Sequence, residues 1–107
     1  MSLQWDRNFA LEQAGDDDEL LAELLDLLRM SSAGDLEKIK EAAAAGDAEA
    51  MGDAAHSIKG AAASMGVVVL RDVAYEIEKK GRDGDLAGAA GYVTELQELV
   101  AALDSLK

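Results

Sequence analysis

The sequence has no cysteine and no proline, and it holds only one histidine and four aromatic residues in a length of 107. Without cysteine, a disulfide framework, a thiolate metal site and a thiol nucleophile are all excluded. No apolar run reaches the roughly 18 residues that a membrane span needs, and no basic N-terminal region leads into an apolar one. We therefore expect one cytoplasmic domain, residues 1–107, that does not contact membranes.

Positive charge is also scarce. The chain has 10 Lys and Arg against 22 Asp and Glu, which gives a formal net charge of −12. Proteins that bind nucleic acids depend mainly on Lys and Arg to neutralise phosphates. The charge balance therefore argues against a nucleic-acid partner.

The composition predicts an all-α fold. Alanine occurs 21 times, whereas Val, Ile and Thr together occur ten times. Alanine is the strongest helix former, and the β-branched residues favour strands. The absence of proline leaves helix interiors intact.

Glycines and acidic residues divide the chain into helices. Apolar spacing predicts a short helix over 5–14, with Trp5 and Phe9 facing the core, and longer helices over 48–64, 67–80 and 85–106. Another helix begins after the acidic residues 16–18 and either ends near residue 31, restarting at 35, or bends at Gly34 and continues to 45. Asp47 and Asp85 are expected to cap helices, and residues 81–84 to form a turn. Short connections make successive helices antiparallel, so we predict an up-down four-helix bundle with a short extra N-terminal helix.

The single histidine, His56, lies in the middle of the helix predicted over 48–64. At 100° per residue, the apolar residues of this helix fall within an arc of roughly 80°, and His56 projects about 140° from its middle. These apolar residues are Met51, Ala55, Ile58, Ala62 and Met65. The imidazole is therefore expected on the solvent-facing side of the helix.

Small residues flank this histidine. Gly52 precedes it by one turn, Gly60 follows it by one turn, and Ala63 lies a further turn along the same face. A glycine inside a helix costs about 1 kcal/mol relative to alanine, and local violations of this kind tend to mark functional sites. The pattern favours clearance for a macromolecular partner, although close helix packing would explain either glycine alone.

Two charged residues are expected beside the imidazole. Lys59 lies one turn after His56 and would attract an anion attached to the ring. In an antiparallel hairpin turning near residue 67, residue n lies beside residue 134−n, so His56 is level with Glu78, and Lys79 and Lys80 lie within a turn of it. A hydrogen bond from one imidazole nitrogen to Glu78 would fix the tautomer and leave the other nitrogen as a nucleophile. The alternative is that Glu78 is an ordinary solvated charge.

The segment from His56 to Gly66, HSIKGAAASMG, followed by Leu70, fits the pattern H-x-x-K-G-x(5)-G-x(3)-L. This pattern resembles the signature of histidine-containing phosphotransfer (HPt) domains. The lead-in Ala45-Gly46-Asp47 and the leucine-rich helix before it are also similar to that family. The resemblance covers about residues 5–105.

The resemblance implies a phosphocarrier in a two-component phosphorelay. His56 would exchange a phosphoryl group with the aspartate of a response-regulator receiver domain, and a sensor or hybrid histidine kinase would lie upstream. Lys59 would steady the phosphoryl oxygens, Glu78 would orient the imidazole, and Gly60 would admit the receiver. The domain would act as a monomer without a cofactor, because Mg²⁺ would be held by the receiver. It has no phosphate-binding glycine-rich motif, so neither ATP binding nor autokinase activity is expected.

Three other functions fit parts of the pattern. The His56 face could dock a partner without any phosphoryl transfer. Asp83-x-Asp85 followed by Gly88 resembles the start of a calcium loop, but Ala87 and Thr94 stand where oxygen ligands belong, so no metal site is predicted. A hydrolase with His56 as its base would lack a partner nucleophile.

Overall fold

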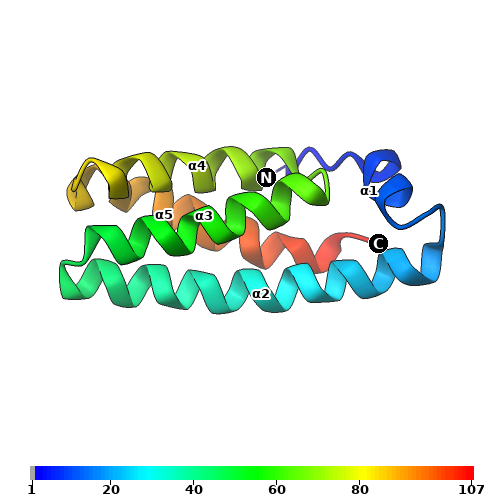
Figure 1. Ribbon diagram of the computed structural model, residues 1–107, viewed down its shortest axis with the longest axis horizontal. Helices are drawn as coiled ribbons and strands as arrows, with labels where there is room; N and C mark the ends of the chain where they lie inside the picture. The colour runs from blue at the N-terminus through cyan, green and yellow to red at the C-terminus, as the bar shows by residue number, and fades with distance from the viewer. Residues whose placement is uncertain (1) are drawn as a thin grey trace.

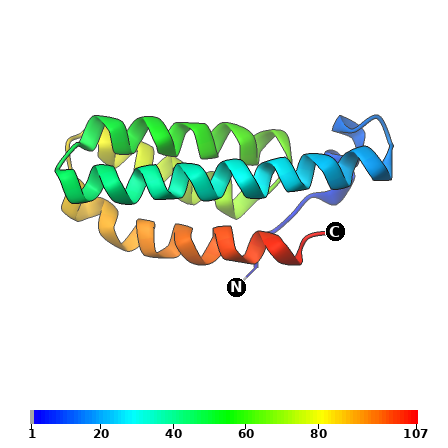
Figure 2. The ribbon, with the colours of Figure 1, turned by 90° about the horizontal axis from the view of Figure 1, so that it is seen from below.

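The computed structural model describes residues 2–107, which form a bundle of four long helices and one short one. The short helix is α1 (Arg7–Gln13). The long helices are α2 (Asp18–Ala45), α3 (Ala48–Ser64), α4 (Val68–Arg82) and α5 (Leu86–Ala102), and a 3₁₀ turn (Leu103–Ser105) follows α5. Successive long helices run antiparallel, and α1 lies at the end of the bundle where α2 begins (Figures 1 and 2). The predicted all-α four-helix bundle with a short N-terminal helix is confirmed.

The longest helix, α2, sets the length of the molecule. Its 28 residues, at about 1.5 Å per residue, match the 42 Å long axis, and Figure 1 shows it running from end to end. It passes through Gly34 without interruption, so the choice left open by the sequence is decided in favour of one continuous helix. No other group lies within 4 Å of where a Cβ on Gly34 would be.

Acidic residues cap the helices where the sequence predicted. The Asp17 carboxylate accepts hydrogen bonds from the backbone N–H groups of Glu19 and Leu20. Asp47 accepts from Ala50 N–H at 3.0 Å, and Asp85 accepts from Gly88 N–H at 2.8 Å. These bonds satisfy donors that have no partner within the first turn of a helix.

The N-terminal segment holds the turn between α3 and α4 in place. α4 has no side-chain cap, and the Leu3 carbonyl accepts from Val69 N–H at 3.1 Å instead. Leu3 itself is buried, so the bundle begins before the residue 5 suggested by the resemblance. Gly66 has φ +69°, and a Cβ there would lie 2.9 Å from the Asp6 carbonyl oxygen. Only glycine fits this turn.

Several expectations about individual residues were wrong. Phe9 is 37% exposed rather than directed into the core. Trp5 does pack against the core as expected, half-buried and with its Nε1–H donating to the Met65 carbonyl. α4 extends to Arg82, so the predicted turn begins only at Asp83. The last helix ends at Ala102 rather than near 106, and a 3₁₀ turn follows.

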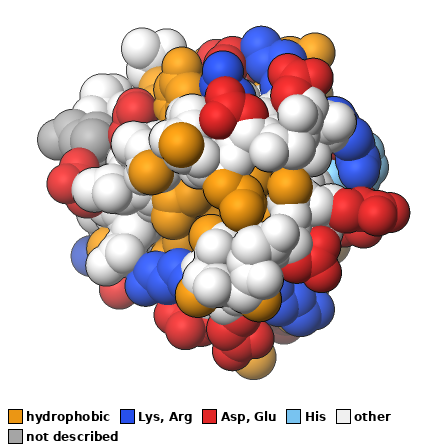
Figure 3. Space-filling model, turned by 90° about the vertical axis from the view of Figure 1, so that its left-hand side faces the viewer, with side chains coloured by type: hydrophobic (Ala, Val, Ile, Leu, Met, Phe, Trp, Pro, Cys, Tyr) orange, Lys and Arg blue, Asp and Glu red, His pale blue; other side chains and the backbone are white. Residues whose placement is uncertain are grey.

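The apolar arc predicted for α3 faces the core as expected, since all five of its residues are buried. At the end of the bundle where α2 meets α3 and α4 meets α5, apolar side chains gather among acidic and basic ones (Figure 3). None of the helices within residues 2–107 combines the length and the apolar character that a bilayer span requires.

Candidate functional site

The imidazole of His56 lies on the surface, where α3 packs against α4. Its side chain is 61% exposed, and Nδ1 lies 2.8 Å from Oε2 of Glu78 on the neighbouring helix. The sequence register that placed these two residues level with each other is therefore confirmed. Because Nδ1 is held by the carboxylate, Nε2 is the nitrogen that remains available to a reacting group.

Glu78 is the buried centre of a charged cluster. Its side chain is only 10% exposed, and Oε1 lies 2.6 Å from Nζ of Lys59. On the other oxygen, Oε2, Arg82 Nη2 adds a longer contact of 3.5 Å from one turn along α4. The second guanidinium nitrogen of Arg82 reaches Asp53 on α3 at 2.9 Å. A buried carboxylate is thus surrounded by groups that donate to it from both helices.

These contacts decide the charge on Glu78. Burial alone raises the pKa of its carboxyl group, but the hydrogen bonds and positive charges of Lys59 and His56 outweigh burial and lower the pKa below its ordinary value of 4.5. Glu78 is therefore ionised at neutral pH. An ionised carboxylate accepts a hydrogen bond from Nδ1–H and stabilises positive charge on the ring.

The sequence suggested that Gly52 gives a partner access to His56, and this expectation was wrong. Gly52 is buried, and a Cβ on it would lie 3.4 Å from Cα of Gly81 in α4. A Cβ on Gly81 would lie 2.7 Å from Cα of Gly52. The two glycines let the backbones of α3 and α4 touch, and this close approach brings Glu78 within reach of His56.

Gly60 and Ala63, by contrast, are exposed. No other group lies within 4 Å of where a Cβ on Gly60 would be, so the surface next to the imidazole is open. Further along α3, an apolar groove runs between that helix and α2. It is lined by Gln13, Leu24, Leu27, Leu28, Ser31, Ala61, Ser64 and Met65.

Of the lysines expected near His56, only Lys59 pairs with Glu78. Lys79 pairs with Glu76 at 2.8 Å and Lys80 with Asp85 at 3.7 Å, so neither takes part in the cluster. Arg82, which also belongs to the basic residues at the end of α4, does take part, because its spacing of four residues puts it beside Glu78 on one face of the helix. Asp85 caps α5, and residues 2–107 contain no group of three or more His, Asp or Glu that could hold a metal ion.

Comparison with known proteins agrees with this geometry. A model of the family described as the Hpt domain matches residues 23–106. The chain belongs to the Hpt family. Its fold is similar to that of histidine-containing phosphotransfer protein B (HptB) from Pseudomonas aeruginosa PAO1, with a TM-score of 0.86 and 28% sequence identity over 94% of this chain and 87% of that one. No curated protein matches the sequence.

Membership of the Hpt family establishes the general role of the chain. Hpt domains carry phosphoryl groups in two-component phosphorelays, which also contain receiver domains and kinases, and they are phosphocarriers rather than kinases. The chain therefore functions in histidine phosphotransfer within phosphorelay signalling.

Proposed function

We propose that His56 is the residue that carries the phosphoryl group and that it exchanges this group with the aspartate of a response-regulator receiver domain. The observation that carries the proposal is the pairing of an exposed imidazole with a buried, ionised carboxylate on Nδ1. That pairing fixes the tautomer in which Nε2 has a free lone pair directed away from Glu78.

In the proposed reaction, the Nε2 lone pair of His56 attacks the phosphorus of the receiver's aspartyl phosphate. The new P–N bond forms as the P–O bond to the receiver carboxylate breaks, and the carboxylate leaves with its electron pair. No proton needs to move, because Nδ1–H stays on the ring and the imidazolium charge is balanced by Glu78. Reversal of these steps returns the phosphoryl group to an aspartate.

Lys59 supplies the positive charge for the transferred group. Its ammonium lies one helical turn from His56, is 28% exposed and pairs with Glu78. Transfer of this kind depends mainly on positioning and charge neutralisation. We propose that Lys59 contacts the phosphoryl oxygens once they arrive, while Arg82 keeps Glu78 paired.

The surface beyond the imidazole suits a protein partner. Gly60 and Ala63 leave it flat, and the apolar groove between α2 and α3 lies next to it. Leu27, at the rim of this groove, is 61% exposed. We propose that a receiver domain contacts this groove while its aspartate reaches His56, and that the Mg²⁺ of the reaction is bound by the receiver. We also propose that this monomeric chain neither binds ATP nor phosphorylates itself.

The test is phosphoryl uptake from purified receiver domains of the same genome, each labelled with radioactive acetyl phosphate. The unmodified protein should take up label that is lost in acid and kept in base, as expected of a phosphoramidate. His56→Gln should take up none, while Ser57→Ala, the neighbouring exposed position, should behave as the unmodified protein. Acid-stable label, or label on His56→Gln, would contradict the assignment.

The second candidate is an interaction module that docks a partner through the His56 face without any transfer. The apolar groove favours docking of some kind. In that case His56→Gln would bind the partner and support its function as well as the unmodified chain does.

A further inference from the structure

Charge is distributed unevenly along this acidic chain. Residues 54–82, which include most of α3 and all of α4, hold five Lys and Arg against three Asp and Glu. The rest of the chain holds five Lys and Arg against nineteen Asp and Glu. Residues 54–82, which surround the His56 site, therefore carry a small excess of positive charge, whereas the rest of the chain is strongly acidic.

Within this region, cationic side chains lie around an exposed tyrosine, Tyr75. The ring of Tyr75 is 47% exposed, and the Nζ atoms of Lys59 and Lys79 lie 5.0 Å and 4.6 Å from its centroid. Both distances are within the roughly 6 Å of a cation–π contact. Arg71, one turn earlier in α4, lines a shallow hollow together with Lys59, Tyr75 and the acidic Asp72. We call this group, Tyr75 with Lys59, Arg71 and Lys79, the Tyr75 platform.

The platform adjoins the phosphoryl site through a shared residue. The Lys59 ammonium contacts the Tyr75 ring and also Glu78, whose other oxygen holds His56. The local acids, Glu76 and Asp72, pair with Lys79 at 2.8 Å and with Arg71 at 2.9 Å. Exposed pairs of this kind contribute only about 0–1 kcal/mol, so a partner's carboxylates can replace them at little cost.

We propose that the Tyr75 platform binds an acidic surface on the receiver partner and steers it onto His56, an inference that rests on the proposed function. The rest of the protein surface is strongly acidic and repels an acidic partner, whereas the Tyr75 platform attracts it. Such complementarity raises the rate of encounter and fixes the orientation of docking. The proposed receiver binds Mg²⁺ beside its reacting aspartate, and Mg²⁺ is held in proteins by carboxylate oxygens, so this partner has the charge that the platform attracts.

The experiment measures the second-order rate constant of phosphoryl transfer from the receiver that reacts fastest with the unmodified protein. Lys79→Glu is compared with Lys40→Glu, which makes the same charge change on α2. Both lysines are partly exposed, and each loses an ion pair to an acid three residues earlier, Glu76 or Glu37. We expect Lys79→Glu to slow transfer about tenfold at 50 mM salt and less than twofold at 500 mM, because salt screens exposed charges. Lys40→Glu should slow it less than twofold at both.

Each alternative result has a distinct meaning. Equal rates for Lys79→Glu and Lys40→Glu, with normal uptake by the unmodified protein, would overturn the platform and leave the proposed function standing. A loss that persists at 500 mM salt would also overturn it, because steering must weaken on screening. Dimers at 50 mM salt that Lys79→Glu abolishes would show that the platform binds a second copy of this chain instead. No uptake by the unmodified protein from any receiver would overturn both proposals.

Discussion

One buried side chain, Glu78, connects all the charged groups of the site. A hydrogen bond to an ionised group contributes about 1.5–3 kcal/mol, so removal of its charge should affect the imidazole directly. We expect Glu78→Gln to slow phosphoryl transfer about tenfold, because the amide still accepts from Nδ1–H but no longer balances the imidazolium. ¹⁵N chemical shifts of the imidazole should show the Nδ1–H tautomer less populated in Glu78→Gln than in the unmodified protein.

Arg82→Gln provides the comparison for this measurement. It removes the longer contact to Oε2 and leaves Lys59 and His56 on the carboxylate. Its transfer rate should therefore fall less than that of Glu78→Gln. If Glu78→Gln transfers phosphoryl groups at the normal rate with an unchanged tautomer, the orienting role of Glu78 is wrong.

The same residue should make stability depend on pH. The pKa of Glu78 is lowered in the folded state by the hydrogen bonds and charges of Lys59 and His56, which exceed the opposing effect of burial. Its stabilising contribution is therefore complete above the ordinary carboxyl value of 4.5 and is lost as the pH falls through the lower folded value. Thermal unfolding should show Glu78→Gln less stable than the unmodified protein at pH 7, with the difference narrowing steadily below pH 4.5. A difference that stays constant over this range would contradict the ion pairing.

At the scale of the helices, the two glycines beside His56 have different roles: Gly52 lets α3 and α4 approach each other closely, whereas Gly60 leaves the surface open. Gly60 is open, so Gly60→Ala should stabilise the protein by about 1 kcal/mol through helix propensity alone. Gly60→Ala should also slow phosphoryl transfer from the receiver, because the added methyl group reduces the clearance beside His56. Gly34→Ala is the matched control, because Gly34 is equally open within α2 and should give the same stabilisation with no change in transfer. If Gly60→Ala and Gly34→Ala transfer phosphoryl groups at the same rate, the proposed role of Gly60 in partner access is wrong.

The α3–α4 hairpin also shows what sequence can and cannot predict. Helical geometry alone placed His56 outside the core, and the hairpin register placed Glu78 beside it, because both depend only on regular spacing. The contact between Gly52 and Gly81 depends on how closely the two helices cross, and no local pattern records that distance. For the same reason, the burial of Leu3 was not foreseen, since it depends on the start of a helix more than 60 residues later.

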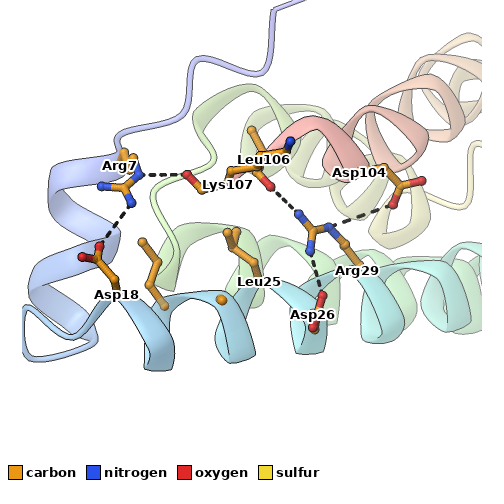
Figure 4. A pocket seen from close by; sticks show the side chains of 10 residues that line it. Arg7, Asp18, Leu25, Asp26, Arg29, Asp104, Leu106 and Lys107 are labelled. Carbon is orange, nitrogen blue, oxygen red and sulfur yellow. Dashed lines mark hydrogen bonds and ion pairs between the residues drawn. The ribbon is translucent and has the colours of Figure 1, made fainter.

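At the scale of the whole molecule, Arg29 of the long helix α2 holds the C-terminal residues against that helix. Arg29 Nε donates to the Leu103 carbonyl at 3.0 Å. One of its terminal nitrogens donates to the Leu106 carbonyl, and the other pairs with Asp26 at 2.8 Å (Figure 4). Carbonyls at the C-terminal end of a helix have no partner within it. Arg29, which is only 24% exposed, supplies that partner from the neighbouring helix.

Arg29→Met keeps the apolar stem of this side chain and removes its donors. Two backbone bonds are lost, and a typical hydrogen bond contributes about 0.5–1.5 kcal/mol, so the free energy of unfolding should fall by about 1–3 kcal/mol. Hydrogen exchange should accelerate in the last turn of α5 and in the 3₁₀ turn but not in the α3–α4 hairpin. The rate of phosphoryl transfer should not change, because His56, Lys59 and Glu78 lie on that hairpin. Arg7→Met removes a 45%-exposed arginine of α1 whose Nε donates to the Lys107 carbonyl, and it should destabilise the protein less. Faster exchange throughout α3 and α4 in Arg29→Met would show instead that the chain end supports the whole bundle, and the site with it.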